Sequence, residues 1–185
     1  MNNFKHSILA LMHLASNPTK IGRVNYFPQD LLSLSYDEVI LNPTYYDKKS
    51  IFFIDQSRKS SSVNSNCHSV IESYSYLKDK SLIKINDMEV YNEHYIKFCT
   101  TLKKLFKVKK VDCHIYFGKK NSFSFNFHKD SMDVLLYCLD GKKDIKFKKR
   151  TITINSGSWL FIPRHTNHKA EYPSDSITLS FGVYK

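Results

Sequence analysis

The sequence predicts a mainly β protein with N-terminal helices, arranged as a jelly-roll barrel. Two observations lead to this prediction. Residues 123–183 consist almost entirely of short apolar strands and turns, whereas the helical and mixed segments come earlier in the chain. This order is typical of helices that pack outside an antiparallel barrel. The length of 185 residues, 42% of them apolar, suits one domain with a sizeable core.

The chain is expected to form a single domain over residues 1–185. Residues 1–110 would be a mixed helical and β support, and residues 111–185 the jelly-roll core. Residues 1–15 suggest an amphipathic helix rather than a signal peptide, because their apolar run is short and broken by His13. No stretch approaches the roughly 20 apolar residues that a membrane-spanning helix requires.

Four segments of the support region have a recognisable pattern. Alternation predicts strands over residues 50–55 and 81–86, and helical spacing of apolar residues predicts a helix over residues 92–106. The serine-rich segment Ser57–Ser65 is predicted to be a loop, and it is a candidate lid. A short helix or a turn is expected over residues 29–40.

The first strand of the predicted core is Val111–Phe117, which alternates strictly. Its odd-numbered residues are apolar, whereas Asp112, His114 and Tyr116 share the other face. Successive side chains of a strand point to opposite sides. If the polar face looks into the barrel, Tyr116 lines its pocket.

Two further runs predict the central strands. The first begins with an apolar strand over residues 134–139 and continues with a turn at Asp140-Gly141. After the turn, Ile145 and Phe147 alternate with lysines, so the run predicts a hairpin. Lys143 shares the parity of Ile145, so its ammonium is expected to point inward and to need an anionic partner.

The second run has a turn at Ser156-Gly157 and a strand over residues 159–162. Pro163 should end this strand, because proline cannot donate to a β-ladder. A last strand is expected over residues 177–181.

Three side chains between and after these strands have the composition of a metal site. His128 and Asp130 form an H-x-D pair, and His168 follows 40 residues after His128. Two imidazoles and one carboxylate are the ligand set of a facial Fe(II) site. On a strand, His128 and Asp130 would point to the same side. His165 competes with His168 for the third position, and each histidine could instead be an ordinary half-buried residue.

The motifs H-x-D, L-x-G-K-K and G-x-W-L-F-I-P-x-x-x-x-H resemble those of the JmjC-type cupin oxygenases, over about residues 70–183. The likeness is strongest to their ribosomal-oxygenase and cupin-like hydroxylase branch. It implies a double-stranded β-helix and a 2-oxoglutarate-dependent dioxygenase that uses Fe(II) and O2. The P-x-x-x-x-H spacing favours His168 over His165.

The resemblance also implies roles for individual residues. His128, Asp130 and His168 would bind iron, and Lys143 would pair with the far carboxylate of 2-oxoglutarate. Tyr116 would help to hold the same carboxylate. The sequence departs from the family before the H-x-D pair, where a glycine-rich loop is usual but residues 119–125 contain no glycine.

The charge distribution suggests an anionic partner. The net charge is +11, and residues 103–150 contain 14 of the 28 basic residues against five acidic ones. This cluster is expected to surround the proposed site and to attract an acidic peptide or a nucleic acid. For any single lysine, a solvated surface position is the simpler interpretation.

Three functions follow in order of preference. The first is hydroxylation of a C–H bond in a peptide or protein side chain, with an acidic segment as a candidate substrate. The second is a small-molecule hydroxylase, which the shortness of the chain favours. The third is a metal-binding cupin without turnover, or a basic protein associated with nucleic acid. The four cysteines include no C-x-x-C pair, as in proteins of a reducing compartment, which predicts a cytoplasmic location.

Overall fold

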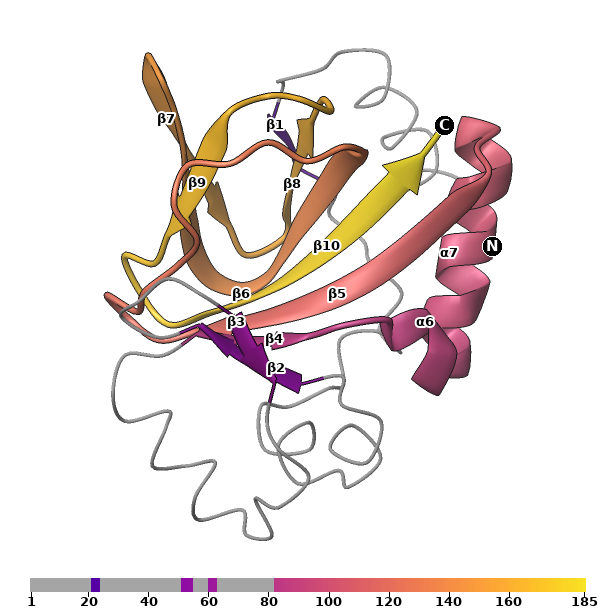
Figure 1. Ribbon diagram of the computed structural model, residues 1–185, viewed down its shortest axis with the longest axis horizontal. Coiled ribbons are helices and arrows are strands. Elements are labelled where there is room, and N and C mark those ends of the chain that lie inside the picture. Colours follow the sequence, from indigo (N-terminus) through magenta and orange to yellow (C-terminus); the bar gives the residue numbers. More distant parts are fainter. Residues whose placement is uncertain (1–20, 24–50, 55–59, 63–81) are drawn as a thin grey trace, which may run out of the picture.

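The computed structural model describes residues 21–23, 51–54, 60–62 and 82–185. It is a curled, antiparallel β-sheet with helices on its outer side, which confirms the predicted mainly β, jelly-roll fold (Figure 1). The elements, in chain order, are β1 (Ile21–Arg23), β2 (Ile51–Ile54), β3 (Ser60–Ser62), β4 (Leu82–Ile85), α6 (Met88–Tyr91), α7 (Glu93–Phe106), β5 (Lys110–Gly118), β6 (Asp133–Phe147), β7 (Arg150–Asn155), β8 (Ser158–Ile162), β9 (His168–Glu171) and β10 (Ser176–Tyr184).

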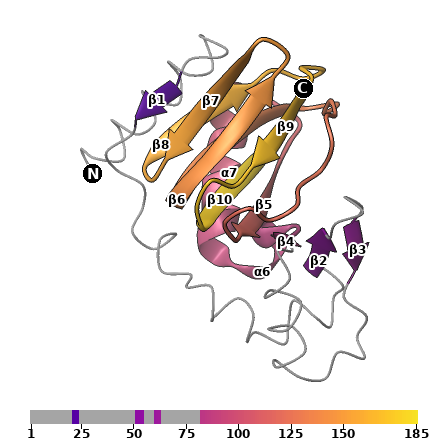
Figure 2. The same ribbon diagram turned by 90° about the vertical axis from the view of Figure 1, so that its left-hand side faces the viewer.

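The long strand β6 organises the sheet. Its first half pairs with β8 on one edge and with β10 on the other. Its second half pairs with β7 and β9 along the same two edges. The two halves of β6 therefore belong to two layers of the curled sheet. The bend in β6 places the layer with β7 and β9 over the inner face formed by β10 and β5 (Figure 2).

The bend in β6 corrects the predicted hairpin. Asp140 and Gly141 do not reverse the chain, because both remain paired with β10 across a one-residue bulge. Gly141 has φ 71°, a left-handed conformation that suits a bulge as well as it suits a turn. The chain reverses instead after Phe147, which pairs with Arg150 across a two-residue connection.

The rest of the larger sheet runs from β10 through β5, β4 and β2 to β3. In β5, the strictly alternating apolar and polar side chains lie on opposite faces of the sheet, as predicted. Cys113, Ile115 and Phe117 belong to the main core cluster between the sheet and α7, whereas His114 and Tyr116 line the inner pocket.

Helix α7 covers the outer face of this sheet and confirms the predicted helix. Asn92 caps its N-terminus, where the side chain accepts a hydrogen bond from His94 N–H at 2.9 Å. Phe98 packs against Trp159 and Phe181, with ring centroids 6.3 and 5.1 Å apart. Burial of these rings holds the helix against β8 and β10.

The remaining predictions divide into three groups. The strands expected over residues 50–55 and 81–86 are β2 and β4, and Pro163 follows directly on the end of β8. The loop prediction for Ser57–Ser65 is wrong for residues 60–62, because these pair with β2 as β3. The helix expected within residues 1–15 and the helix or turn expected over residues 29–40 lie outside the described residues.

Candidate metal centre and pocket

The structure brings His128, Asp130 and His168 together. One ligand atom of each lies within 4.8 Å of the other two. His168 begins β9, whereas His128 and Asp130 lie in the connection between β5 and β6. The expected strand around the H-x-D pair is wrong: only His128 is paired, in an isolated bridge to His168.

Both imidazoles are oriented in the same way. His128 Nδ1 lies 2.8 Å from the carbonyl oxygen of Asn126, and His168 Nδ1 lies 2.9 Å from that of Thr166. Since a carbonyl only accepts, this network assigns the ring proton to Nδ1 in each histidine. The Nε2 lone pairs remain available, and they face Asp130 at 3.9 and 3.5 Å.

This geometry fits a divalent metal. Histidines that bind metals usually donate their second ring N–H to a carbonyl or carboxylate, which fixes the ring. The two Nε2 atoms and the Asp130 carboxylate provide the 2-His-1-carboxylate set. Burial lowers the pKa of His168, which keeps its imidazole in the neutral form that a metal requires.

His165 is not part of this group. Its side chain is exposed, and its backbone has φ 61°. Its N–H donates to the backbone carbonyl of Asp130 at 2.8 Å. His165 therefore helps to position the chain at Asp130, while the imidazole of His168 is the one beside the carboxylate.

Lys143 points into the barrel, as its parity predicted. The residue is only 3% exposed, and its Nζ lies 4.6 Å from the ring centroid of Tyr116 and 5.3 Å from that of Tyr172. Burial lowers the pKa of its ammonium to about 8. Among the described residues, no carboxylate lies within ion-pair distance of it, so the pocket presents a buried cation that is suited to an anionic ligand.

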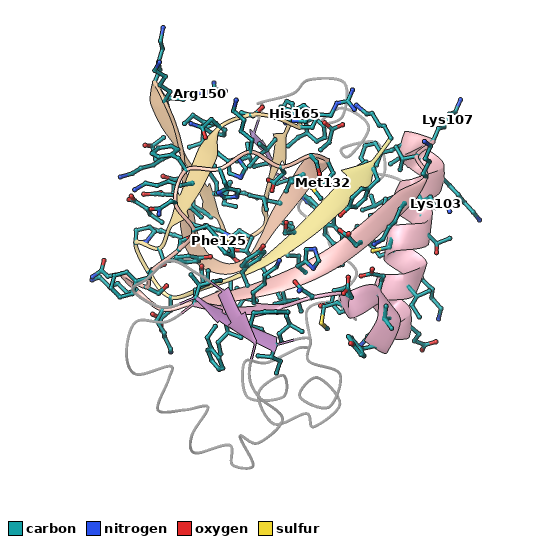
Figure 3. All side chains as sticks on the ribbon, viewed as in Figure 1. Lys103, Lys107, Phe125, Met132, Arg150 and His165 are labelled. Atoms are coloured by element: carbon teal, nitrogen blue, oxygen red, sulfur yellow. The ribbon has the colours of Figure 1, made fainter. Side chains whose placement is uncertain are left out.

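The metal-ligand candidates and Lys143 line one cavity of about 150 Å³. It lies inside the curl of the sheet, where Phe125 and Met132 are found (Figure 3). Its wall includes, besides these residues, Lys84, Asp112, His114, Tyr116, Ser124, Val134, Leu136, Ile145, Ala170, Tyr172, Ser180 and Gly182. The Lys143 ammonium, the three metal-ligand candidates and apolar side chains thus surround a space for a small ligand.

Lys84 and Tyr172 also line this pocket, although the sequence did not single them out. Lys84 lies directly beside Tyr116 in the β4–β5 pairing, and a lysine within an otherwise apolar strand was the available signal. Tyr172 follows β9, and its buried hydroxyl has no hydrogen-bond partner among the described residues. Tyr172 also packs over Gly118, where any Cβ would collide with its ring.

Some basic residues of the 103–150 segment lie away from the site. Lys103 and Lys107 belong to α7 and its C-terminal cap, outside the sheet, whereas Arg150 lies at the tip of the β6–β7 hairpin (Figure 3). Attraction of an anionic partner by this segment stays a prediction.

The comparison with curated proteins gives one relevant relative. The chain is 25% identical over 135 residues to the bifunctional lysine-specific demethylase and histidyl-hydroxylase NO66 of Dictyostelium discoideum. The match covers 60% of this chain and 26% of the relative, so the chain spans about a quarter of that protein. No family model matches the sequence.

Solved cupin structures are also similar. A cupin-2 domain protein from Shewanella frigidimarina has a TM-score of 0.36 at 18% identity and covers 40% of this chain and 70% of its own. A cupin superfamily protein from Desulfitobacterium hafniense has a TM-score of 0.38 at 19% identity, covering 40% and 68%. At such scores these likenesses add no weight to the fold, which the strand pairing itself establishes.

The relative and the barrel support a JmjC/cupin-type protein, in agreement with the resemblance seen in the sequence. Within the part of the chain that the structure describes, no helix has the length and apolar character needed to cross a membrane.

Proposed function

We propose that this JmjC/cupin-type protein is an Fe(II)- and 2-oxoglutarate-dependent oxygenase that hydroxylates a C–H bond of a peptide or protein side chain. The observation that carries the proposal is the combination of two separate features in one cavity. One is the His128, Asp130 and His168 group, and the other is the buried ammonium of Lys143, which has no ion-pair partner among the described residues. A metal alone would account for the first feature but not for the second.

The protein side chains have distinct roles in this proposal. His128, Asp130 and His168 would hold the iron, with both imidazole rings fixed through Nδ1. Lys143 would bind the far carboxylate of 2-oxoglutarate, and Tyr116 would position the Lys143 ammonium through the contact with its ring. When bound, Fe(II) and 2-oxoglutarate supply the oxidising chemistry that places one atom of O2 on the substrate and the other in succinate.

The pocket walls would protect this chemistry from water. Leu136 and Ile145 are buried apolar residues on the two halves of β6, and Phe125 packs edge-on against His128 with ring centroids 5.8 Å apart. Asp130 completes the ligand set, whereas a small residue there would leave a position for halide. Hydroxylation rather than halogenation is therefore the proposed outcome.

The proposed location is the cytoplasm. Cys99, Cys113 and Cys138 are buried free thiols, which is usual in a reducing compartment. The proposed partner is a peptide or protein, and this class is supported by the curated relative, which is named as a histidyl-hydroxylase. Nucleic acid is a less favoured partner, because Lys103 and Lys107 on α7 lie apart from Arg150 (Figure 3).

A small-molecule hydroxylase is the second candidate. The observation that favours it is the cavity volume of about 150 Å³, which is below the roughly 300–1,000 Å³ of typical ligand pockets. A space of this size can enclose a small free acid completely, whereas a peptide substrate could place only one side chain in it.

The test is oxygen incorporation. Purified protein is incubated with Fe(II), 2-oxoglutarate and ¹⁸O₂, with and without a peptide library and a small-molecule library, and succinate is analysed by mass spectrometry. We expect ¹⁸O-labelled succinate from the wild type and its loss in Asp130→Ala, while Asp140→Ala, at an exposed position, keeps it. Labelled peptide or labelled small molecule then separates the two candidates. Equal labelled succinate from wild type and Asp130→Ala would overturn the assignment of Asp130 as a metal ligand. No labelled succinate from a folded wild-type protein would leave a non-catalytic metal-binding cupin as the better account.

A further inference from the structure

A second cation faces the same pocket. Lys84 lies on β4 directly opposite Tyr116 of β5, so both side chains are on the inner face of the sheet. Its Nζ is 5.7 Å from the ring centroid of Tyr116, the same ring that the Lys143 ammonium contacts at 4.6 Å. Lys143 suffices for one carboxylate, so Lys84 requires its own explanation.

Lys84 is half-buried without a close anion. Burial lowers the pKa of its ammonium, and the acidic groups that oppose this effect are Asp112, Asp87 and Asp130. Among the described residues, none of these carboxylates lies within ion-pair distance of Lys84 Nζ. Partial desolvation without a partner is unfavourable for an ammonium, and a bound anion would relieve it.

The Asp112 carboxylate already has other partners. Asp112 is 3% exposed, and its Oδ1 accepts the backbone N–H of Gly182 at 3.2 Å. Its Oδ2 lies 3.4 Å from Lys110 Nζ. A Cβ at position 182 would collide with Oδ1, so the glycine allows this close approach. The Asp112 carboxylate therefore binds groups of β5 and β10 and not the Lys84 ammonium.

His114 adds a neutral donor next to this cation. The Asp87 N–H donates to His114 Nδ1 at 3.3 Å, which assigns the ring proton to Nε2. Burial and the nearby Lys84 ammonium lower the pKa of His114 to about 4, so the ring is uncharged at neutral pH. Its Nε2 is 3.6 Å from Asp112 Oδ1, too far for a good hydrogen bond.

We propose that Lys84 and His114 form a second anion subsite in the pocket, which binds a carboxylate of the substrate. One ammonium and one neutral N–H suit the two oxygens of a carboxylate. The assignment of this subsite to the substrate rests on the proposed oxygenase function. The proposal assigns the substrate to the acidic class, either an aspartate or glutamate side chain of a peptide or a free small carboxylic acid.

The test reads the lysines directly, without metal or 2-oxoglutarate. Lysine ¹³Cε resonances are followed by NMR while the protein is titrated with acetyl-glutamate methylamide, which imitates a peptide side chain, and separately with propionate. The neutral controls are acetyl-glutamine methylamide and propionamide. Lys84→Arg identifies the Lys84 resonance, and Lys97→Met, at an exposed position on α7, is the matched control variant.

A saturable shift at Lys84 with a carboxylate and not with its amide supports the proposal. A response to the glutamate peptide alone favours a peptide source, and a response to propionate alone favours a free acid. In Lys84→Met, the shift of the His114 ring should require about tenfold more carboxylate, as expected for one charge-assisted hydrogen bond.

Two results would overturn the subsite. One is the absence of any Lys84 shift at the highest soluble carboxylate concentration, and the other is an equal shift with the neutral amides. Because iron and 2-oxoglutarate are absent from the titration, such a failure is independent of the oxygenase assignment. Conversely, a saturable shift in a protein that fails the ¹⁸O test would leave a carboxylate-binding cupin.

Discussion

His128 and His168 face each other in one antiparallel bridge, where each backbone N–H donates to the carbonyl of the other at 3.0 Å. Their ring centroids are 4.5 Å apart. The two imidazoles are therefore brought together by a pair of backbone hydrogen bonds, although one comes from a connection and the other from β9. The bridge places both Nε2 atoms next to Asp130 without a continuous strand at the H-x-D pair.

Lys143 should make the free protein less stable. Burial lowers its pKa from the usual 10.5 to about 8, and this shift corresponds to about 3 kcal/mol of unfavourable free energy at neutral pH as an upper bound. We expect Lys143→Met to raise the free energy of unfolding by about 1–3 kcal/mol and to weaken binding of 2-oxoglutarate strongly. Chemical denaturation and calorimetric titration measure the two effects, with Lys142→Met, at the exposed neighbouring position, as the control. A destabilised Lys143→Met variant would mean that the ammonium already has a good partner.

The same lysine predicts a pH window. Its pKa in the folded state is lower than in the unfolded state, so between about pH 8 and 10.5 the unfolded chain binds more protons. The contribution of Lys143 to folding stability should therefore rise with pH across this window and be least favourable below about pH 8. We expect the stability difference between Lys143→Met and wild type to shrink as the pH rises through this window. A difference that stays constant would argue against the lowered pKa.

The bend in β6 depends on Gly141. Its φ of 71° is strained for other residues, and a Cβ there would collide with the backbone carbonyl of Asp175. Gly141→Ala should lower the free energy of unfolding by about 1–3 kcal/mol, because the clash is with backbone and cannot be relieved by a rotamer change. Urea denaturation measures this effect, and Lys142→Ala should stay within about 0.5 kcal/mol of wild type. An unchanged midpoint in Gly141→Ala would mean that β6 bends without this contact.

Strict alternation made some of the pocket predictable. The polar face of β5 and the inward direction of Lys143 both follow from the two-residue period of a strand, and the structure places Tyr116 and Lys143 in one cavity. The helix over residues 92–106 was equally accessible, because Asn92 and the apolar spacing mark its start and its buried face.

Other features depend on pairing that a single segment does not reveal. Asp140-Gly141 has the residues of a hairpin turn, but a left-handed glycine also serves a bulge, and the pairing with β10 decides between them. Lys84 joins the pocket only because β4 pairs with β5 in the register that sets Lys84 beside Tyr116. Likewise, the separation of Lys103 and Lys107 from the pocket follows from the position of α7 outside the sheet (Figures 1 and 3).

The most direct test of the central claim is an anaerobic titration with Fe(II) and 2-oxoglutarate, which follows the visible iron-to-keto-acid charge-transfer band. Wild type and His165→Ala should both develop the band, whereas His128→Ala and His168→Ala should not, and Lys143→Met should require far more 2-oxoglutarate. A folded wild-type protein without the band, or a band that survives in His168→Ala but not in His165→Ala, would contradict the proposed metal centre.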